Sequence, residues 1–146
     1  MAGIKSRIQE SVKSAMKARD KARLDAARLL LSALQYEEMQ RKVDELPDEV
    51  STSILQREVN RRKEELEFAE KAGRKDALEA VTLEIKFIEE FLPQQLSGEQ
   101  LEKIILEMKS RDPALNMGGV MKALKESYAG QYDGKAASEI AKRVLS

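Results

Sequence analysis

Apolar side chains recur three or four residues apart along most of this chain, and this spacing constrains the fold more than any other feature. The clearest run is Leu78, Val81, Ile85, Ile88 and Leu92, in which each residue lies about one helical turn from the next. Strong helix formers dominate the composition, and the 146 residues include only 7 glycines and 3 prolines. No segment shows a persuasive strand pattern. The sequence therefore predicts an all-α fold.

Residues that start or stop helices divide this pattern into seven expected helices. The first begins near Ile4 and ends near Asp20, and the fourth ends at Leu92-Pro93, because proline disfavours helix immediately before it. Other caps and ends are expected, in chain order, at Asp48 (cap of the third), Gly73 (end of the third), Ser97 with Gln100 (capping box of the fifth), Asn116 (cap of the sixth), Gly130 (end of the sixth) and Asp133-Gly134 (start of the seventh).

The segment 93–96 is the expected boundary between two modules. Residues 1–93 should form an N-terminal module of about four helices, and residues 97–146 should form a small three-helix bundle. The fourth helix is apolar over a wide part of its circumference, so we expect it to contact neighbours on two sides.

The residue types exclude most kinds of catalytic site. The chain has no histidine and no cysteine, so it lacks a neutral-pH imidazole base, a thiolate nucleophile and the usual soft metal ligands. Glutamates are frequent, but no spacing singles out an acid–base pair or a carboxylate metal loop. We therefore expect no catalytic residue, no cofactor and no bound metal.

Charge and hydropathy indicate where the protein acts. No continuous apolar segment has the length of a signal peptide or a membrane span, which predicts a cytoplasmic protein without a membrane partner. The 26 basic and 26 acidic residues cancel, whereas non-specific DNA binders carry a strong basic excess. We expect no DNA partner, and any nucleic-acid surface must come from local segregation of charge.

Two adjacent glycines after Asn116 are the most informative local motif. Gly118 and Gly119 fall in the first turn of the sixth helix, and Lys122 and Lys125 follow one and two turns later. A helix N-terminus attracts phosphate, and glycine lets a ligand approach the backbone closely. Alternatively, the glycines allow this helix to pack closely on the fifth helix, which is the commoner reason for such a pair.

Basic residues become more frequent toward the C-terminus. From Lys122 onward five basic residues stand against three acidic ones. Together with the glycine motif this gives the candidate RNA-binding residues Gly118, Lys122, Lys125, Lys135, Lys142 and Arg143. Tyr128 and Tyr132 have rings that can stack on bases, but Tyr128 is in register with Met121 and Leu124 and is therefore expected in the core.

The first module has a basic N-terminal part. Eight basic residues up to Arg28 stand against three acidic ones, and this excess either meets RNA or an acidic partner, or balances the glutamates of the third and fourth helices. Arg28 and Arg62 border apolar positions, where arginines usually pair with carboxylates or extend to water; a ligand carboxylate or phosphate is the alternative partner.

Several motifs resemble one known family over nearly the whole chain. Residues 28–34, Arg61-Arg62 and 91–97 are similar to the N-terminal part of YqeY-like proteins. Residues 117–121 and Asp133-Gly134-Lys135 resemble the tail that these proteins share with the GatB subunit of tRNA-dependent amidotransferases. In the amidotransferase this tail is implicated in contacting tRNA.

The resemblance implies a function in tRNA binding, with tRNA or a tRNA-aminoacylation or amidation complex as the partner. It does not carry the amidotransferase reaction over, because the catalytic parts of that enzyme have no counterpart in this sequence. A second hypothesis is a protein-interaction adaptor, meeting its partner through the fourth helix or the basic N-terminal part. A third is an accessory to a carbon–nitrogen ligase with glutamine as amido-N-donor, an activity that family annotation can assign by homology.

Overall fold

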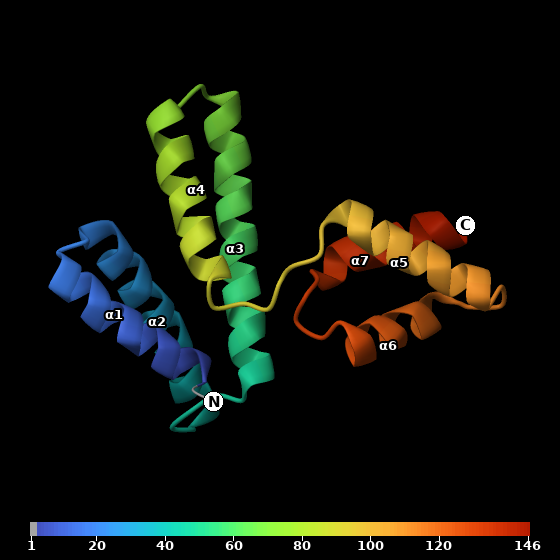
Figure 1. Ribbon diagram of the computed structural model, residues 1–146, viewed down its shortest axis with the longest axis horizontal. Helices are drawn as coiled ribbons and strands as arrows, with labels where there is room; N and C mark the ends of the chain where they lie inside the picture. Colours follow the sequence, from blue (N-terminus) through green and yellow to red (C-terminus); the bar gives the residue numbers. More distant parts are fainter. Residues whose placement is uncertain (1–2) are drawn as a thin grey trace. The chain divides into compact units, whose positions relative to one another are not determined.

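The structure is a computed structural model that describes residues 3–146, and these residues form seven helices and no strand (Figure 1). The all-α prediction is confirmed. In chain order the helices are α1 (Ile4–Ala18), α2 (Lys21–Arg41), α3 (Asp48–Lys71), α4 (Lys75–Glu89), α5 (Gly98–Arg111), α6 (Met117–Ser127) and α7 (Gly134–Leu145). None of these seven helices is both long enough and apolar enough to cross a bilayer.

The chain forms two compact units that divide between Leu92 and Pro93. Unit 1 contains α1–α4 and unit 2 contains α5–α7. Each unit has an apolar core of its own, and each is described by itself.

In unit 1, α1 packs against α2, and α3 packs against α4 as a long hairpin (Figure 1). The helix α4 also contacts α2, as its wide apolar surface predicts. Ile8, Leu30, Leu55 and Ile88 are fully buried and come from all four helices. The core therefore joins the two helix pairs into one unit.

In unit 2, α7 packs against both α5 and α6. The core contains Leu101 and Ile105 of α5, Val120 and Leu124 of α6, and the small residues Ala137 and Ala141 of α7. Because alanine side chains are short, α7 can approach both neighbours closely. The segment before α5 is fastened to the loop before α7, since the Leu96 amide donates to the Gln131 carbonyl at 2.7 Å.

Three helix starts follow the sequence prediction. The side chains of Ser97, Asn116 and Asp133 accept hydrogen bonds from the backbone N–H three residues later, and Gln100 completes the capping box at Ser97. A further cap is present that the sequence analysis missed, because Asp20 accepts from the Arg23 N–H at the start of α2.

Three predicted helix boundaries were wrong by one to a few residues. Asp48 is the first residue of α3 and the cap is Pro47, so the Asp48 carboxylate acts through its charge in the first turn. The helix α4 ends at Glu89, ahead of Pro93, because residues 90–92 form tighter i→i−3 bonds. The helix α6 ends at Ser127, before Gly130. Gly73 has φ +69° directly after the cap of α3, as expected of a C′ glycine.

Candidate nucleic-acid interface

Gly118, Lys122 and Lys125 share one exposed stripe of α6. At 100° per residue these three positions lie within roughly 60° of the helix circumference. All three are exposed, whereas Val120 and Leu124 on the opposite side are buried in the core of unit 2. The structure thus brings two cations and a glycine onto a single solvent-facing surface, which we call the α6 stripe.

The N-terminus of α6 lies at one end of this stripe. The Asn116 side chain accepts from the Gly119 N–H at 2.9 Å, which accounts for one of the amides that an α-helix leaves unpaired at its start. The partial positive charge of the helix end acts over the first turn of α6, where Gly118 lies, whereas Lys125 stands in the last turn.

Neither glycine is needed for packing on α5, so that interpretation was wrong. A Cβ at Gly118 would meet only the Asn116 side chain, at 3.6 Å, which is ordinary contact. A Cβ at Gly119 would lie 2.7 Å from a methyl group of Leu115, in the loop before α6. Gly118 therefore leaves the start of the stripe open, and Gly119 makes room for Leu115.

The candidate residues on α7 form a second surface. Lys135 and Lys142 lie seven residues apart on one exposed side of α7. Arg143 differs, because its guanidinium forms an ion pair with Glu102 of α5 at 3.3 Å. Within residues 3–146, Lys122, Lys125, Lys135 and Lys142 take part in no ion pair.

Three other polar side chains of unit 2 are already engaged. Lys109 of α5 donates to the Val144 carbonyl at 2.9 Å and so satisfies the last turn of α7. Tyr128 packs against the core of unit 2, as predicted, and Tyr132 does so as well. Burial raises the pKa of Tyr132. Neither ring is placed as an open stacking platform.

The basic N-terminal part of unit 1 is partly balanced from within. Arg23 donates two hydrogen bonds to the Glu90 carboxylate, at 3.0 and 3.2 Å, and its guanidinium lies over the Phe87 ring at 4.7 Å. The hydrogen bond with Glu90 raises the pKa of Arg23, against a smaller opposite effect of burial. Arg7 donates to the Glu90 carbonyl at 2.8 Å and lies over Phe91.

A second pair fixes the start of α1. Lys5 donates to the Glu38 carboxylate at 3.0 Å and to the Asp44 carbonyl at 3.3 Å. Glu38 is buried, so this pair replaces the water that the carboxylate loses. The predicted balance with glutamates of the third and fourth helices is thus confirmed for Arg23, which pairs with Glu90, whereas Lys5 pairs with Glu38 of α2 instead.

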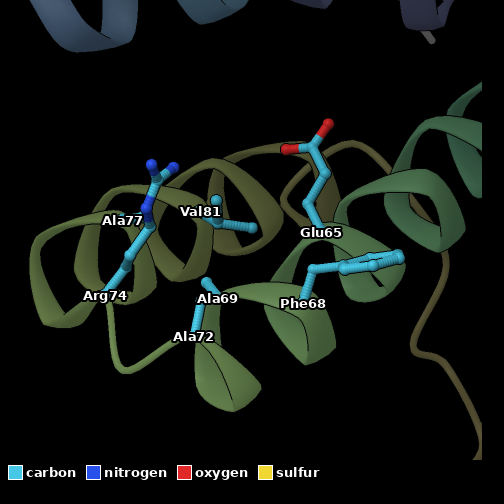
Figure 2. Close-up of a pocket in the computed structure, with 7 residues that line it drawn as sticks. All are labelled: Glu65, Phe68, Ala69, Ala72, Arg74, Ala77 and Val81. Atoms are coloured by element: carbon cyan, nitrogen blue, oxygen red, sulfur yellow. The ribbon is translucent and has the colours of Figure 1, made fainter.

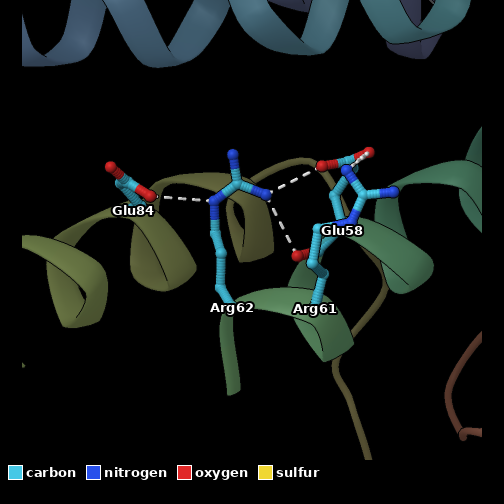
Figure 3. Close-up of polar contacts among 4 residues, drawn as sticks. All are labelled: Glu58, Arg61, Arg62 and Glu84. Atoms are coloured by element: carbon cyan, nitrogen blue, oxygen red, sulfur yellow. Dashed lines mark hydrogen bonds and ion pairs between the residues drawn. The ribbon is translucent and has the colours of Figure 1, made fainter. Parts of the chain in front are cut away.

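Arg62 is buried and has protein carboxylates as its partners (Figure 3). It donates to Glu58 at 2.9 Å and to Glu84 at 2.9 Å. Burial lowers the pKa of Arg62, but the hydrogen bonds and charges of the two glutamates together outweigh it and leave the pKa raised. Arg62 therefore has a structural role. Arg28 is exposed and extends into solvent.

Fold and surface together define the class: an all-helical protein of two compact units, with unpaired lysines on two helices of the second. The family model described as Yqey-like protein matches residues 5–145. The chain therefore belongs to the family of YqeY-like proteins. A comparison with curated proteins finds no match.

Proposed function

We propose that unit 2 binds RNA, with tRNA as the preferred ligand, and that the α6 stripe makes the principal phosphate contacts. The observation that carries the proposal is the contrast between paired and unpaired cations. Arg23, Arg62 and Lys5 are committed to carboxylates of this chain. Among residues 3–146, Lys122 and Lys125 stand exposed on α6 without such partners.

This arrangement suits a phosphodiester backbone better than a single small anion. Lys122 and Lys125 form a row on the surface of α6, parallel to the helix axis. They can therefore neutralise successive phosphates and release the counterions bound there. Gly118 continues the stripe without a side chain, which lets a strand approach the backbone of α6. Lys135 and Lys142 add contacts from α7, and Arg143 contributes only if its exposed pair with Glu102 opens.

The preference for tRNA rests on the family resemblance of residues 117–121 and 133–135. We assign no amide transfer to this chain, because the catalytic parts of the amidotransferase have no counterpart in its sequence. Conversion of glutamine on a charged tRNA by the purified protein alone would contradict this part and favour a carbon–nitrogen ligase.

The test is fluorescence anisotropy with bulk tRNA and with an unrelated RNA hairpin, titrated from low to physiological salt. We expect tRNA to bind more tightly than the hairpin at physiological salt. Reversal of both stripe lysines (K122E/K125E) should weaken binding and reduce the salt slope by about 2, one unit for each lost phosphate contact.

A matched control separates the stripe from net charge. Lys63 and Lys86 are exposed lysines of unit 1, and the described residues give them no ion pair. The variant K63E/K86E changes the net charge by the same amount and should keep the slope of the unaltered protein. Equal loss in both double variants would mean that binding follows total charge, which contradicts a site on α6.

A second candidate function is protein binding through the outer side of α2. This helix buries Leu30 and Leu34 on one side and yet exposes Leu29, Tyr36 and Met39 on the opposite side. Large apolar side chains gathered on an exposed side of a helix mark a surface for a partner. The fourth helix, the other surface expected for an adaptor, offers less, since Val81, Ile85, Phe87 and Ile88 lie in the core of unit 1.

The charges around this outer side indicate the kind of partner. Lys21 and Arg28 flank it as exposed cations outside the ion pairs described, and Asp25 is the carboxylate among them. They suit an amphipathic helix with acidic margins. A designed amphipathic peptide of leucine and glutamate should bind the protein, and a matched peptide of leucine and lysine should not. The variant Y36S/M39S should bind neither peptide.

A further inference from the structure

The α3–α4 hairpin carries a groove that neither function uses. Its volume is about 460 Å³, and it is lined by residues of both helices and of the turn between them: Glu65, Phe68, Ala69, Ala72, Arg74, Ala77 and Val81. Figure 2 shows that the lining runs from Arg74 at one end to Glu65 and Phe68 at the other, with Val81 and Ala69 between them. Carbon atoms make up most of this lining.

One end of the groove projects and the other is hollow. Phe68 is 77% exposed, the highest value among the large apolar residues of the described chain. At the other end stand Ala72 and Ala77, whose short side chains leave space beside the helix backbones. An exposed aromatic ring next to a shallow apolar hollow is the usual form of an interface anchor and its pocket.

The charges at the two ends are opposite and unused. Glu65 lies at the end with Phe68, and Arg74 lies at the end with the alanines (Figure 2). Among residues 3–146 neither side chain takes part in an ion pair, although other glutamates and arginines of unit 1 do. The two charges are therefore available to a partner.

We propose that this groove binds the same groove of a second copy of the chain, related by a two-fold axis near Ala69 and Val81. A two-fold interface requires a self-complementary surface, in which each contact occurs twice. With the hairpins antiparallel, Phe68 of one copy enters the hollow at Ala72 and Ala77 of the other. The same rotation brings Glu65 of each copy to Arg74 of the other.

The alternating pattern of ring, hollow and opposite charges argues for this occupant over a foreign helix. A foreign partner needs only one of the two ends, whereas a second copy uses both ends twice. The exposed side of α2 does not have this property, because its two exposed cations, Lys21 and Arg28, stand against one carboxylate, Asp25. Pairing of the hairpins would form a four-helix bundle.

Sedimentation equilibrium of the full chain tests the proposal. We expect a concentration-dependent monomer–dimer equilibrium, and F68A should raise the dimer dissociation constant about 100-fold because two buried rings are lost. E65R alone and R74E alone should each raise it about 10-fold, and E65R/R74E should return it close to the original value.

Two features of the design keep the result interpretable. Phe68, Glu65 and Arg74 are exposed, so circular dichroism should show unchanged helix content in each variant. Leu83 is 64% exposed on α4 outside the groove lining, and L83A should leave the dissociation constant unchanged. A chain that remains monomeric at about 1 mM, a dimer insensitive to F68A, or charge reversals that do not restore each other would each overturn the proposal.

Discussion

The Nε atom of Arg62 donates a hydrogen bond to a carboxylate oxygen of Glu84 at 2.9 Å, and this bond joins α3 to α4 (Figure 3). The same guanidinium donates to the Glu58 side chain at 2.9 Å and to the Glu58 carbonyl at 3.0 Å. Arg62 and Glu58 are 6% and 7% exposed, so each replaces the water that the other has lost. The cluster sets how the two helices of the hairpin lie against each other.

Removal of the Arg62 side chain should therefore destabilise unit 1 strongly. In R62A the Glu58 carboxylate stays buried, and the ion pair left to it among residues 3–146 is the one with Arg61, at 3.7 Å. We expect a loss of about 3 kcal/mol of unfolding free energy, at the lower end for a broken buried pair because Glu84 is partly exposed. Denaturant unfolding of the full chain measures it.

Two milder substitutions serve as controls. R62K keeps the charge but cannot hold both carboxylates. Its unfolding free energy should therefore lie between those of R62A and the unaltered protein. E84Q should lower the unfolding free energy by less than about 1 kcal/mol, because Arg62 keeps its hydrogen bonds with Glu58. If R62A unfolds at the same denaturant concentration as the unaltered protein, the cluster does not stabilise the hairpin.

Arg23 and Glu90 should show a measurable coupling. Arg23 joins the start of α2 to the end of α4 through two hydrogen bonds and the Phe87 ring. A double-mutant cycle with R23A and E90A should give a coupling free energy of about 0.5–1 kcal/mol, because both side chains are nearly half exposed. The coupling should decrease as salt rises from 0.05 to about 0.5 M. Independent, additive losses would contradict it.

The sequence predicts best those features that need only neighbouring residues. Ser97, Asn116 and Asp133 cap helices through bonds to amides three residues away, so their roles follow from local spacing. The all-α fold follows from helical periodicity for the same reason. The helix ends predicted from Pro93 and Gly130 lie a few residues too late, because the last turns tighten before these residues are reached.

Side-chain partners that lie far apart in the sequence were not predictable in this way. Glu90 lies 67 residues after Arg23, and Glu84 lies 22 residues after Arg62. Likewise, Arg143 resembled Lys142 as a candidate, and only the packing of α7 on α5 brings it to Glu102. The sequence located cations, but tertiary packing decides which of them remain unpaired.

Stability at alkaline pH should depend on Tyr132. Burial raises its pKa above the ordinary value of about 10, so the unfolded chain ionises first as the pH rises. Below pH 10 the folded and the unfolded chain both keep the Tyr132 proton, so the unfolding free energy does not change. Above pH 10 the unfolded chain loses this proton first, so the unfolding free energy falls until the pH passes the pKa of the folded state. We expect the unfolding free energy of the unaltered protein, relative to Y132F, to be constant up to about pH 9 and to fall above pH 10.

Unfolding curves between pH 7 and 11 provide this comparison. Lysines also lose their protons in that range, but they are the same in both proteins and cancel in the difference. If the difference is flat to pH 11, burial does not disfavour the phenolate of Tyr132. If it rises with pH, the folded state favours the phenolate, which reverses the predicted sign.

Alanine substitutions should separate the two glycines of α6. In G118A the new methyl group meets only the Asn116 side chain at 3.6 Å, so the higher helix propensity of alanine should stabilise unit 2 by about 0.5 kcal/mol. In G119A the methyl group would lie 2.7 Å from Leu115, which has to move, so this gain should be cancelled or reversed. Thermal unfolding and tRNA anisotropy on the same two variants measure stability and binding independently.

Because Gly118 lies on the α6 stripe and Gly119 beside it, a bulkier G118L should weaken tRNA binding without loss of stability. Equal tRNA affinity for G118L and the unaltered protein would remove the start of α6 from the interface and leave Lys122 and Lys125 as its contacts.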